Sequence, residues 1–170
     1  MKHITKIGIL IAVVALGACT NPGRFGNFGN GVNDGTAGAV VPGSVDDPTS
    51  VAYFQQAIGD RVLFAVDQST LTAEGQAVLD GQANWLLANA DYQAVIEGHA
   101  DEQGTREYNL ALGARRANAA QEYLISKGVP ANRLRVISYG KERPIEVCSN
   151  EACYAKNRRA VTVLAGGLTS

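Results

Sequence analysis

The spacing of apolar and polar positions changes repeatedly between strand-like and helix-like after residue 59. Runs rich in β-branched residues predict strands over residues 61–66, 92–98, 133–139 and 159–165. Apolar positions three or four apart predict helices over residues 72–89, 106–127 and 151–157. This order, β-α-β-α-β followed by a short helix and a final strand, predicts an α/β sandwich with helices on one side of a sheet.

The stretch from Thr20 to Ser50 lacks such a pattern. It contains seven glycines, four asparagines and three prolines, with few large apolar residues. Such a segment cannot bury enough surface to fold alone, so we expect a flexible linker. We expect a short segment near Val51 to Ile58 to pack on the domain that follows.

Residues 1–18 have the pattern of an export signal. Lys2 and Lys6 precede a short apolar run, Ile7 to Leu16. A run of this length is too short to span a bilayer, which needs about 20 apolar residues, and it suits the apolar part of a signal peptide.

The signal-like segment ends in Leu16, Gly17 and Ala18, directly before Cys19. Small residues before a cysteine resemble the lipobox of bacterial lipoproteins. The resemblance implies cleavage before Cys19 and attachment of several acyl chains to it, which is what a stable anchor requires. An ordinary signal peptide, with Cys19 incidental, is the alternative. An Asp directly after the cysteine would resemble an inner-membrane retention signal. Thr20 occupies that position here, and the absence of Asp favours the outer membrane.

Charge excludes one class of partner. The formal net charge is −1 over 170 residues, and loss of Lys2 and Lys6 with the signal would make the chain more acidic. Nucleic-acid binding requires a basic face, so no nucleic-acid partner is expected.

The two remaining cysteines, Cys148 and Cys153, lie close together. In an exported protein this pair predicts a disulfide that pins a surface loop, and two free thiols are the alternative. With no third ligand nearby, the pair is a poor metal site, and no metal or other cofactor is expected.

The densest set of polar side chains covers residues 97–105, between a predicted strand and a predicted helix. This edge is the usual ligand site of α/β folds. His99 beside Asp101 could suggest a catalytic dyad, but neither a nucleophile motif nor a zinc-like set accompanies it. We therefore expect no enzymatic activity.

Binding fits these residues better. Asp101 could accept hydrogen bonds from an ammonium, and Arg116 could hold a carboxylate through two parallel bonds. Such a pair suits a zwitterionic amino-acid group. A direct salt bridge between Asp101 and Arg116 fits the spacing equally well.

Several ordered motifs resemble the OmpA-like peptidoglycan-binding domain. They are GHADEQGT (98–105), EYN (107–109), LGARRANA (112–119), SYGKERP (138–144) and KNRRAV (156–161). The resemblance covers about residues 62–164. It implies helices packed on a mixed four-stranded sheet. We therefore expect three segments: a signal peptide that is removed (1–18), the lipid anchor with a flexible linker (19–58), and the OmpA-like domain (59–168).

The family resemblance also implies a ligand, the meso-diaminopimelate side chain of the peptidoglycan stem peptide, bound non-covalently. Asp101 matches the position that contacts its ammonium, and Arg116 the position that contacts a carboxylate. Asn109 and Leu112 match positions lining the same pocket, and Asp67 matches a further binding position. The cysteine pair is expected to lie away from these motifs and to leave the ligand unaffected.

Lipid-anchored members of this family act in the Tol system. The resemblance therefore implies TolB as a partner, with TolA as a second, and Glu102 and Thr105 as contacts. It also implies a protein in the outer membrane, facing the periplasm, that ties this membrane to the cell wall. A lipoprotein that binds the wall without the Tol proteins is the alternative.

Overall fold

The structure is a computed structural model that describes residues 40–147 and 149–166. The predicted signal peptide, Cys19, Cys148 and residues 20–39 of the predicted linker lie outside the described residues.

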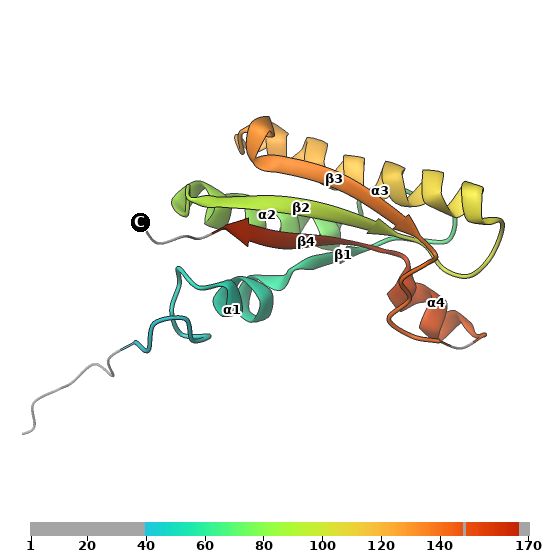
Figure 1. Ribbon diagram of the computed structural model, residues 1–170, viewed down its shortest axis with the longest axis horizontal. Helices are drawn as coiled ribbons and strands as arrows, with labels where there is room; N and C mark the ends of the chain where they lie inside the picture. The colour runs from blue at the N-terminus through green and yellow to red at the C-terminus, as the bar shows by residue number, and fades with distance from the viewer. Residues whose placement is uncertain (1–39, 148, 167–170) are drawn as a thin grey trace, which may run out of the picture. The chain divides into compact units, whose positions relative to one another are not determined.

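The strands form one mixed sheet in the order β1-β4-β2-β3 (Figure 1). They are β1 (Arg61–Leu63), β2 (Tyr92–His99), β3 (Leu134–Gly140) and β4 (Arg159–Gly166). β2 runs parallel to β3 and antiparallel to β4, and β1 pairs antiparallel with β4. The predicted mixed four-stranded sheet is therefore confirmed.

Local signals define the helices that follow the strands. They are α2 (Ala73–Ala88), α3 (Arg106–Ser126), the 3₁₀ turn η2 (Ala131–Arg133) and α4 (Glu151–Asn157). Thr72, Thr105 and Asn150 each accept a hydrogen bond from a backbone N–H of the first helical turn, so each is an N-cap. Among the helices of residues 40–147 and 149–166, none is long and apolar enough to cross a membrane.

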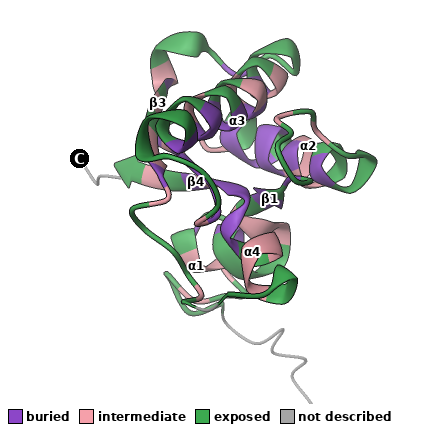
Figure 2. Ribbon diagram, turned by 90° about the vertical axis from the view of Figure 1, so that its right-hand side faces the viewer, coloured by how far each residue is buried: buried purple, intermediate pink, exposed green. Residues whose placement is uncertain are grey.

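The two long helices, α2 and α3, cover one face of the sheet, and the buried residues gather between these layers (Figure 2). Leu79 and Leu86 of α2, Ile96 of β2 and Leu124 of α3 are 0–1% exposed. The opposite face of the sheet is partly open, so β2 alternates between buried and more exposed residues.

Two glycines bring α3 directly onto β2. A Cβ on Gly98 would lie 1.8 Å from the carbonyl oxygen of Gly113, and a Cβ on Gly113 would lie 2.5 Å from Oγ of Ser138. Any side chain at either position would push the helix off the strand. This close contact fixes the first turns of α3 above the end of β2, where the polar residues gather.

The packed part of the chain begins upstream of the predicted boundary at Gly59. Before β1 lie the short helix α1 (Val51–Tyr53) and the π-helical turn η1 (Phe54–Gly59). Phe54 is 0% exposed, and its ring centroid lies 4.9 Å from that of Trp85. The expected packing of this segment on the domain is therefore present.

Hydrogen bonds extend this attachment into the last residues of the predicted linker. The indole N–H of Trp85 donates to the carbonyl of Pro48 over 2.7 Å, and the hydroxyl of Tyr92 donates to the carbonyl of Thr49 over 3.1 Å. We call residues 48–59 the N-terminal clasp.

The first strand is shorter than the predicted range of 61–66. The amide of Phe64 still donates to the carbonyl of Arg158, 2.9 Å away, but the chain then leaves the sheet. The turn that follows contains Asp67, whose φ of 57° is incompatible with a strand.

Candidate ligand-binding site

A cavity of about 290 Å³ opens at the end of β2. Its lining residues come from the loop after β1, the loop after β2 and the first turns of α3: Val66, Asp67, Asp101, Gln103, Gly104, Tyr108, Asn109 and Leu112. The structure thus brings together Asp67, Asp101, Asn109 and Leu112, four of the five residues that the resemblance assigned to binding. Arg116 is not among the lining residues.

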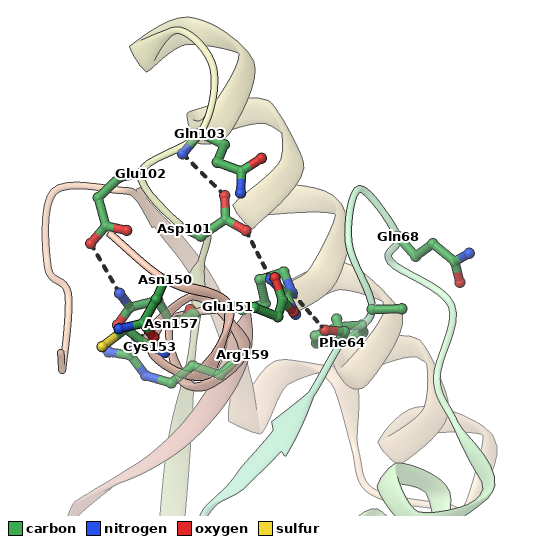
Figure 3. Close-up of polar contacts among 12 residues, drawn as sticks. Phe64, Gln68, Asp101, Glu102, Gln103, Asn150, Glu151, Cys153, Asn157 and Arg159 are labelled. Carbon is green, nitrogen blue, oxygen red and sulfur yellow. Dashed lines mark hydrogen bonds and ion pairs between the residues drawn. The ribbon is translucent and has the colours of Figure 1, made fainter. Parts of the chain in front are cut away.

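Asp101 is held from two sides. Its Oδ1 accepts from the amide of Gln103 over 3.2 Å, and its Oδ2 accepts from Nη1 of Arg158 over 3.1 Å. The residue is 7% exposed, and Figure 3 shows its carboxylate between Gln103 and the α4 region. The direct Asp101–Arg116 ion pair considered above is wrong, because within the described part of the chain Asp101 pairs with Arg158.

Asp67 lines the same cavity as Asp101 and comes from the loop after β1. It has a left-handed backbone, which an aspartate tolerates better than most residues at a small energetic cost. The hydroxyl of Tyr108 donates to its Oδ1, and this hydrogen bond raises the pKa of Tyr108. Two carboxylates therefore line one cavity, an arrangement that attracts a cation.

Asn109 and Leu112 shape the cavity from α3. The side-chain amide of Asn109 donates to the carbonyl of Gln103 over 2.8 Å, which ties the loop after β2 to the helix. Asn109 is 1% exposed and Leu112 4%. Leu112 therefore supplies an apolar wall beside the two carboxylates.

Arg116 lies one helical turn beyond Leu112 and is 0% exposed. Its guanidinium donates to the backbone carbonyls of Ala65, Gln68 and His99 at 2.8–3.1 Å. Burial lowers the pKa of Arg116 to about 10, with Arg158 acting in the same direction and Asp101 against it. The side chain thus remains a cation at neutral pH and joins the two loops that carry Asp67 and Asp101.

His99 has the environment of a neutral core residue. It is 1% exposed, and its ring stacks on Tyr139 with centroids 5.6 Å apart. Burial lowers the pKa of His99 to about 4, helped by the charges of Arg159 and Arg143. Neither ring nitrogen has a hydrogen-bond partner in the described chain, so a dyad with Asp101 is not formed.

The segment that contains the cysteines is closer to the site than expected. Cys153 is disulfide-bonded, while Cys148 lies outside the described residues. Asn157, at the end of α4, donates to Oε1 of Glu102 over 3.0 Å (Figure 3). Its side-chain oxygen accepts from the amides of Ile145 and Glu146. The expectation that this loop lies away from the binding motifs is therefore wrong.

Sequence reasoning missed two residues of the site. Tyr108 precedes Leu112 by four positions, so helical spacing alone would have placed both on one face of α3. Arg158 is 57 residues from Asp101, and no local pattern distinguishes it from its neighbour Arg159.

Within the described residues, no group of three or more His, Cys, Asp or Glu side chains could hold a metal ion.

Comparison with known proteins identifies the family. Residues 63–158 match the model of the OmpA family. The peptidoglycan-associated lipoprotein of Rhizobium meliloti (strain 1021) is 50% identical over 98% of this chain and 92% of its own. That of Haemophilus influenzae (strain ATCC 51907 / DSM 11121 / KW20 / Rd) is 39% identical over 94% of this chain and 97% of its own.

Solved structures agree with these matches. The crystal structure of the peptidoglycan-associated lipoprotein from Burkholderia pseudomallei is 36% identical, with a TM-score of 0.63 over 71% of this chain and 98% of that one. The C-terminal domain of Helicobacter pylori MotB, 21% identical, shares the fold with a TM-score of 0.59 over 62% of this chain and 84% of that one. The chain therefore belongs to the OmpA family and, within it, to the peptidoglycan-associated lipoproteins.

Proposed function

We propose that this protein is an outer-membrane lipoprotein that binds peptidoglycan non-covalently through the meso-diaminopimelate of its stem peptides. Bound in this way, it ties the outer membrane to the cell wall as part of the Tol-Pal system, in support of envelope integrity and cell division. The observation that carries the proposal is the cavity lined by Asp67, Asp101 and the apolar Leu112, with Arg116 buried behind the loop that carries Asp67.

The two carboxylates suit the ammonium group of diaminopimelate. Each oxygen of Asp101 already accepts one hydrogen bond, and a carboxylate oxygen has room for a second. An ammonium that entered the cavity would bond to Asp101 from the open side, with Asp67 opposite. Leu112 would cover the methylene groups of the ligand.

Arg116 is the proposed partner of the ligand's carboxylate, and its geometry sets a condition for that role. The guanidinium is occupied by the carbonyls of Ala65, Gln68 and His99. These bonds use three of its five N–H groups, but Arg116 is 0% exposed, so a carboxylate can reach it only if the loop of residues 65–68 moves and gives up a contact. The ligand oxygen would then replace a neutral carbonyl with a charged acceptor, which makes the stronger hydrogen bond.

This function requires no chemical step. The relatives described above are named for their association with peptidoglycan and not for a catalytic activity. The neutral, buried His99 is unsuited to act as a base. We therefore propose a binding protein that leaves the bonds of the wall unchanged.

A titration with two muropeptides tests the proposed ligand. We expect the diaminopimelate form to bind more tightly than the matched lysine form, which keeps the ammonium but lacks the second carboxylate. A charge-assisted hydrogen bond of this kind contributes about 1.5–3 kcal/mol, so the difference should be roughly 10- to 150-fold. Equal affinities, or binding of neither form, would contradict the assignment of the cavity. Mass spectra of the recovered muropeptides should show no cleavage.

The proposed Tol partners would bind the surface around the cavity. Glu102 and Thr105 flank the cavity in the loop after β2, and Thr105 is exposed while Glu102 is partly so. A TolB molecule on these residues would obstruct the cavity. The titration repeated with saturating TolB should therefore give a weaker apparent affinity, and an unchanged value would argue for wall binding without Tol partners. TolA remains a second proposed partner.

The proposed anchor is the lipid on Cys19, and a single substitution tests it. The Cys19→Ala variant should leave the membrane fraction and, after a salt wash that releases wall-bound protein, appear in the soluble periplasmic extract, because the proposed acyl chains are attached to this cysteine. The matched variant Thr20→Ala keeps Cys19 and should stay with the outer membrane. If the Cys19 variant still sediments with outer membrane after a salt wash that releases wall-bound protein, the lipid anchor is excluded.

A further inference from the structure

Arg158 is shared between two carboxylates of different elements. Its Nη1 lies 3.1 Å from Oδ2 of Asp101 and 3.4 Å from Oε2 of Glu151, and its Nη2 donates to Oε1 of Glu151. Its Nε donates to the carbonyl of Phe64 over 3.1 Å. Arg158 is 4% exposed, whereas the side chain of Glu151 is 64% exposed. A buried cation beneath the cavity is therefore held by an acid on the surface.

The two carboxylates differ in their hold on Arg158. Burial opposes the charged form, but the hydrogen bonds to Glu151 and then the one to Asp101 raise the pKa of Arg158 overall. The hydrogen bond to Arg158 in turn lowers the pKa of Glu151. Glu151 lies along the edge of the guanidinium formed by Nη1 and Nη2. Asp101 therefore accepts a single N–H from Arg158 at Oδ2, while its Oδ1 accepts from the amide of Gln103.

We propose that Glu151 and Arg158 are positioning residues that set the orientation and the effective negative charge of Asp101. The inference rests on the proposed function, in which Asp101 accepts from a ligand ammonium. With Glu151 absent, Arg158 is free to turn both terminal nitrogens to Asp101. That two-bond pair would neutralise the carboxylate and occupy the lone pairs that the ammonium needs.

Glu151 is the better position for a test because its side chain is exposed, so Glu151→Gln should fold normally. Glu146→Gln is a matched control. Glu146 lies in the same segment and pairs with Lys156 over 2.9 Å, away from Arg158. Both variants remove one negative charge and one ion pair, but only the first removes the charge that competes with Asp101 for Arg158.

The experiment follows binding of two probes by NMR titration of the full-length protein. One probe is a diaminopimelate muropeptide with a free amino group, and the other is the same muropeptide with that group acetylated. We expect Glu151→Gln to weaken the first by roughly two- to fivefold, the range of a partly screened charge interaction, and to leave the second unchanged. Glu146→Gln should change neither. Equal losses on both probes, or no loss on either, would overturn the inference.

The amide of Gln103 supplies a readout that needs no ligand, because it donates to Asp101. Its proton shift should change in Glu151→Gln and remain at the wild-type value in Glu146→Gln. An unchanged shift in Glu151→Gln would overturn the charge sharing even if ligand affinity fell. If the wild-type protein binds neither probe, the proposed function fails, while the Gln103 shift still decides between the two states of Arg158.

Discussion

Replacing Asp101 by asparagine should lower the affinity for the diaminopimelate muropeptide by roughly 10- to 100-fold. The loss corresponds to one charge-assisted hydrogen bond between the carboxylate and the ligand ammonium. Asparagine keeps the shape of the side chain and an oxygen that can accept from Gln103. Isothermal titration of wild type and variant, each shown to be folded by circular dichroism, measures the effect.

Asp80→Asn is the control for this substitution. Asp80 lies on α2 and pairs with Lys127 over 2.7 Å, so the control also removes one carboxylate and one ion pair. It should bind the muropeptide like the wild type. If the Asp101 variant bound as tightly as this control, the ammonium would not contact Asp101.

The second large effect is expected at Arg116, where stability and binding change together. Arg116→Ala removes the donor to the carbonyls of Gln68 and His99, whereas the carbonyl of Ala65 still accepts from the amide of Gln68. An acceptor left unpaired in this way costs about 1–3 kcal/mol. We therefore expect the free energy of unfolding in urea to fall by about 2–6 kcal/mol. An unchanged free energy would show that water replaces the guanidinium without cost.

Arg116→Lys separates the two roles, because lysine keeps the charge but cannot serve three carbonyls in one plane. The variant should lose less stability than Arg116→Ala. Because a lysine also cannot form two parallel bonds to a carboxylate, its preference for diaminopimelate over lysine muropeptide should shrink. Full preference in a folded Arg116→Lys protein would limit Arg116 to joining the two loops.

The helices and their starts were predictable because their signals are local. Thr72, Thr105 and Asn150 are caps that act within three residues of themselves, and Gly128, with a φ of 101°, ends α3 in the way that its position in the sequence predicts. The strands were predictable for the same reason, because each is a local run rich in β-branched residues. The exception is the end of β1, which depends on the turn at Asp67.

The residues of the site also divide into those predictable from local sequence and those that are not. Asp101, Asn109 and Leu112 follow one strand and begin one helix, so their proximity is built into a short stretch of chain. The contact of Arg158 with Asp101 joins residues 57 positions apart, and the bonds of Arg116 to Ala65 and Gln68 span about fifty. Such contacts arise only when the sheet assembles, so the spacing of charged residues along the chain does not predict them.

The N-terminal clasp has a mechanical consequence if the protein is a tether. Tension from the membrane would enter the domain at Pro48 and Thr49, beside Trp85 and the first residue of β2. Tension from the wall would enter at Asp101, just past the last residue of β2. The two loads therefore arrive at opposite ends of one central strand (Figure 1).

Along that line, tension passes through the covalent backbone of β2, so the hydrogen bonds of β2 with β3 and β4 are not peeled apart one at a time. The short β1 is the weaker path, because it pairs with β4 over residues 61–63 alone. The clasp precedes β1 in the chain and is closed by buried Phe54 and two side-chain hydrogen bonds. In a tether, the clasp would therefore pass tension to α2 and the central strand before it reached β1.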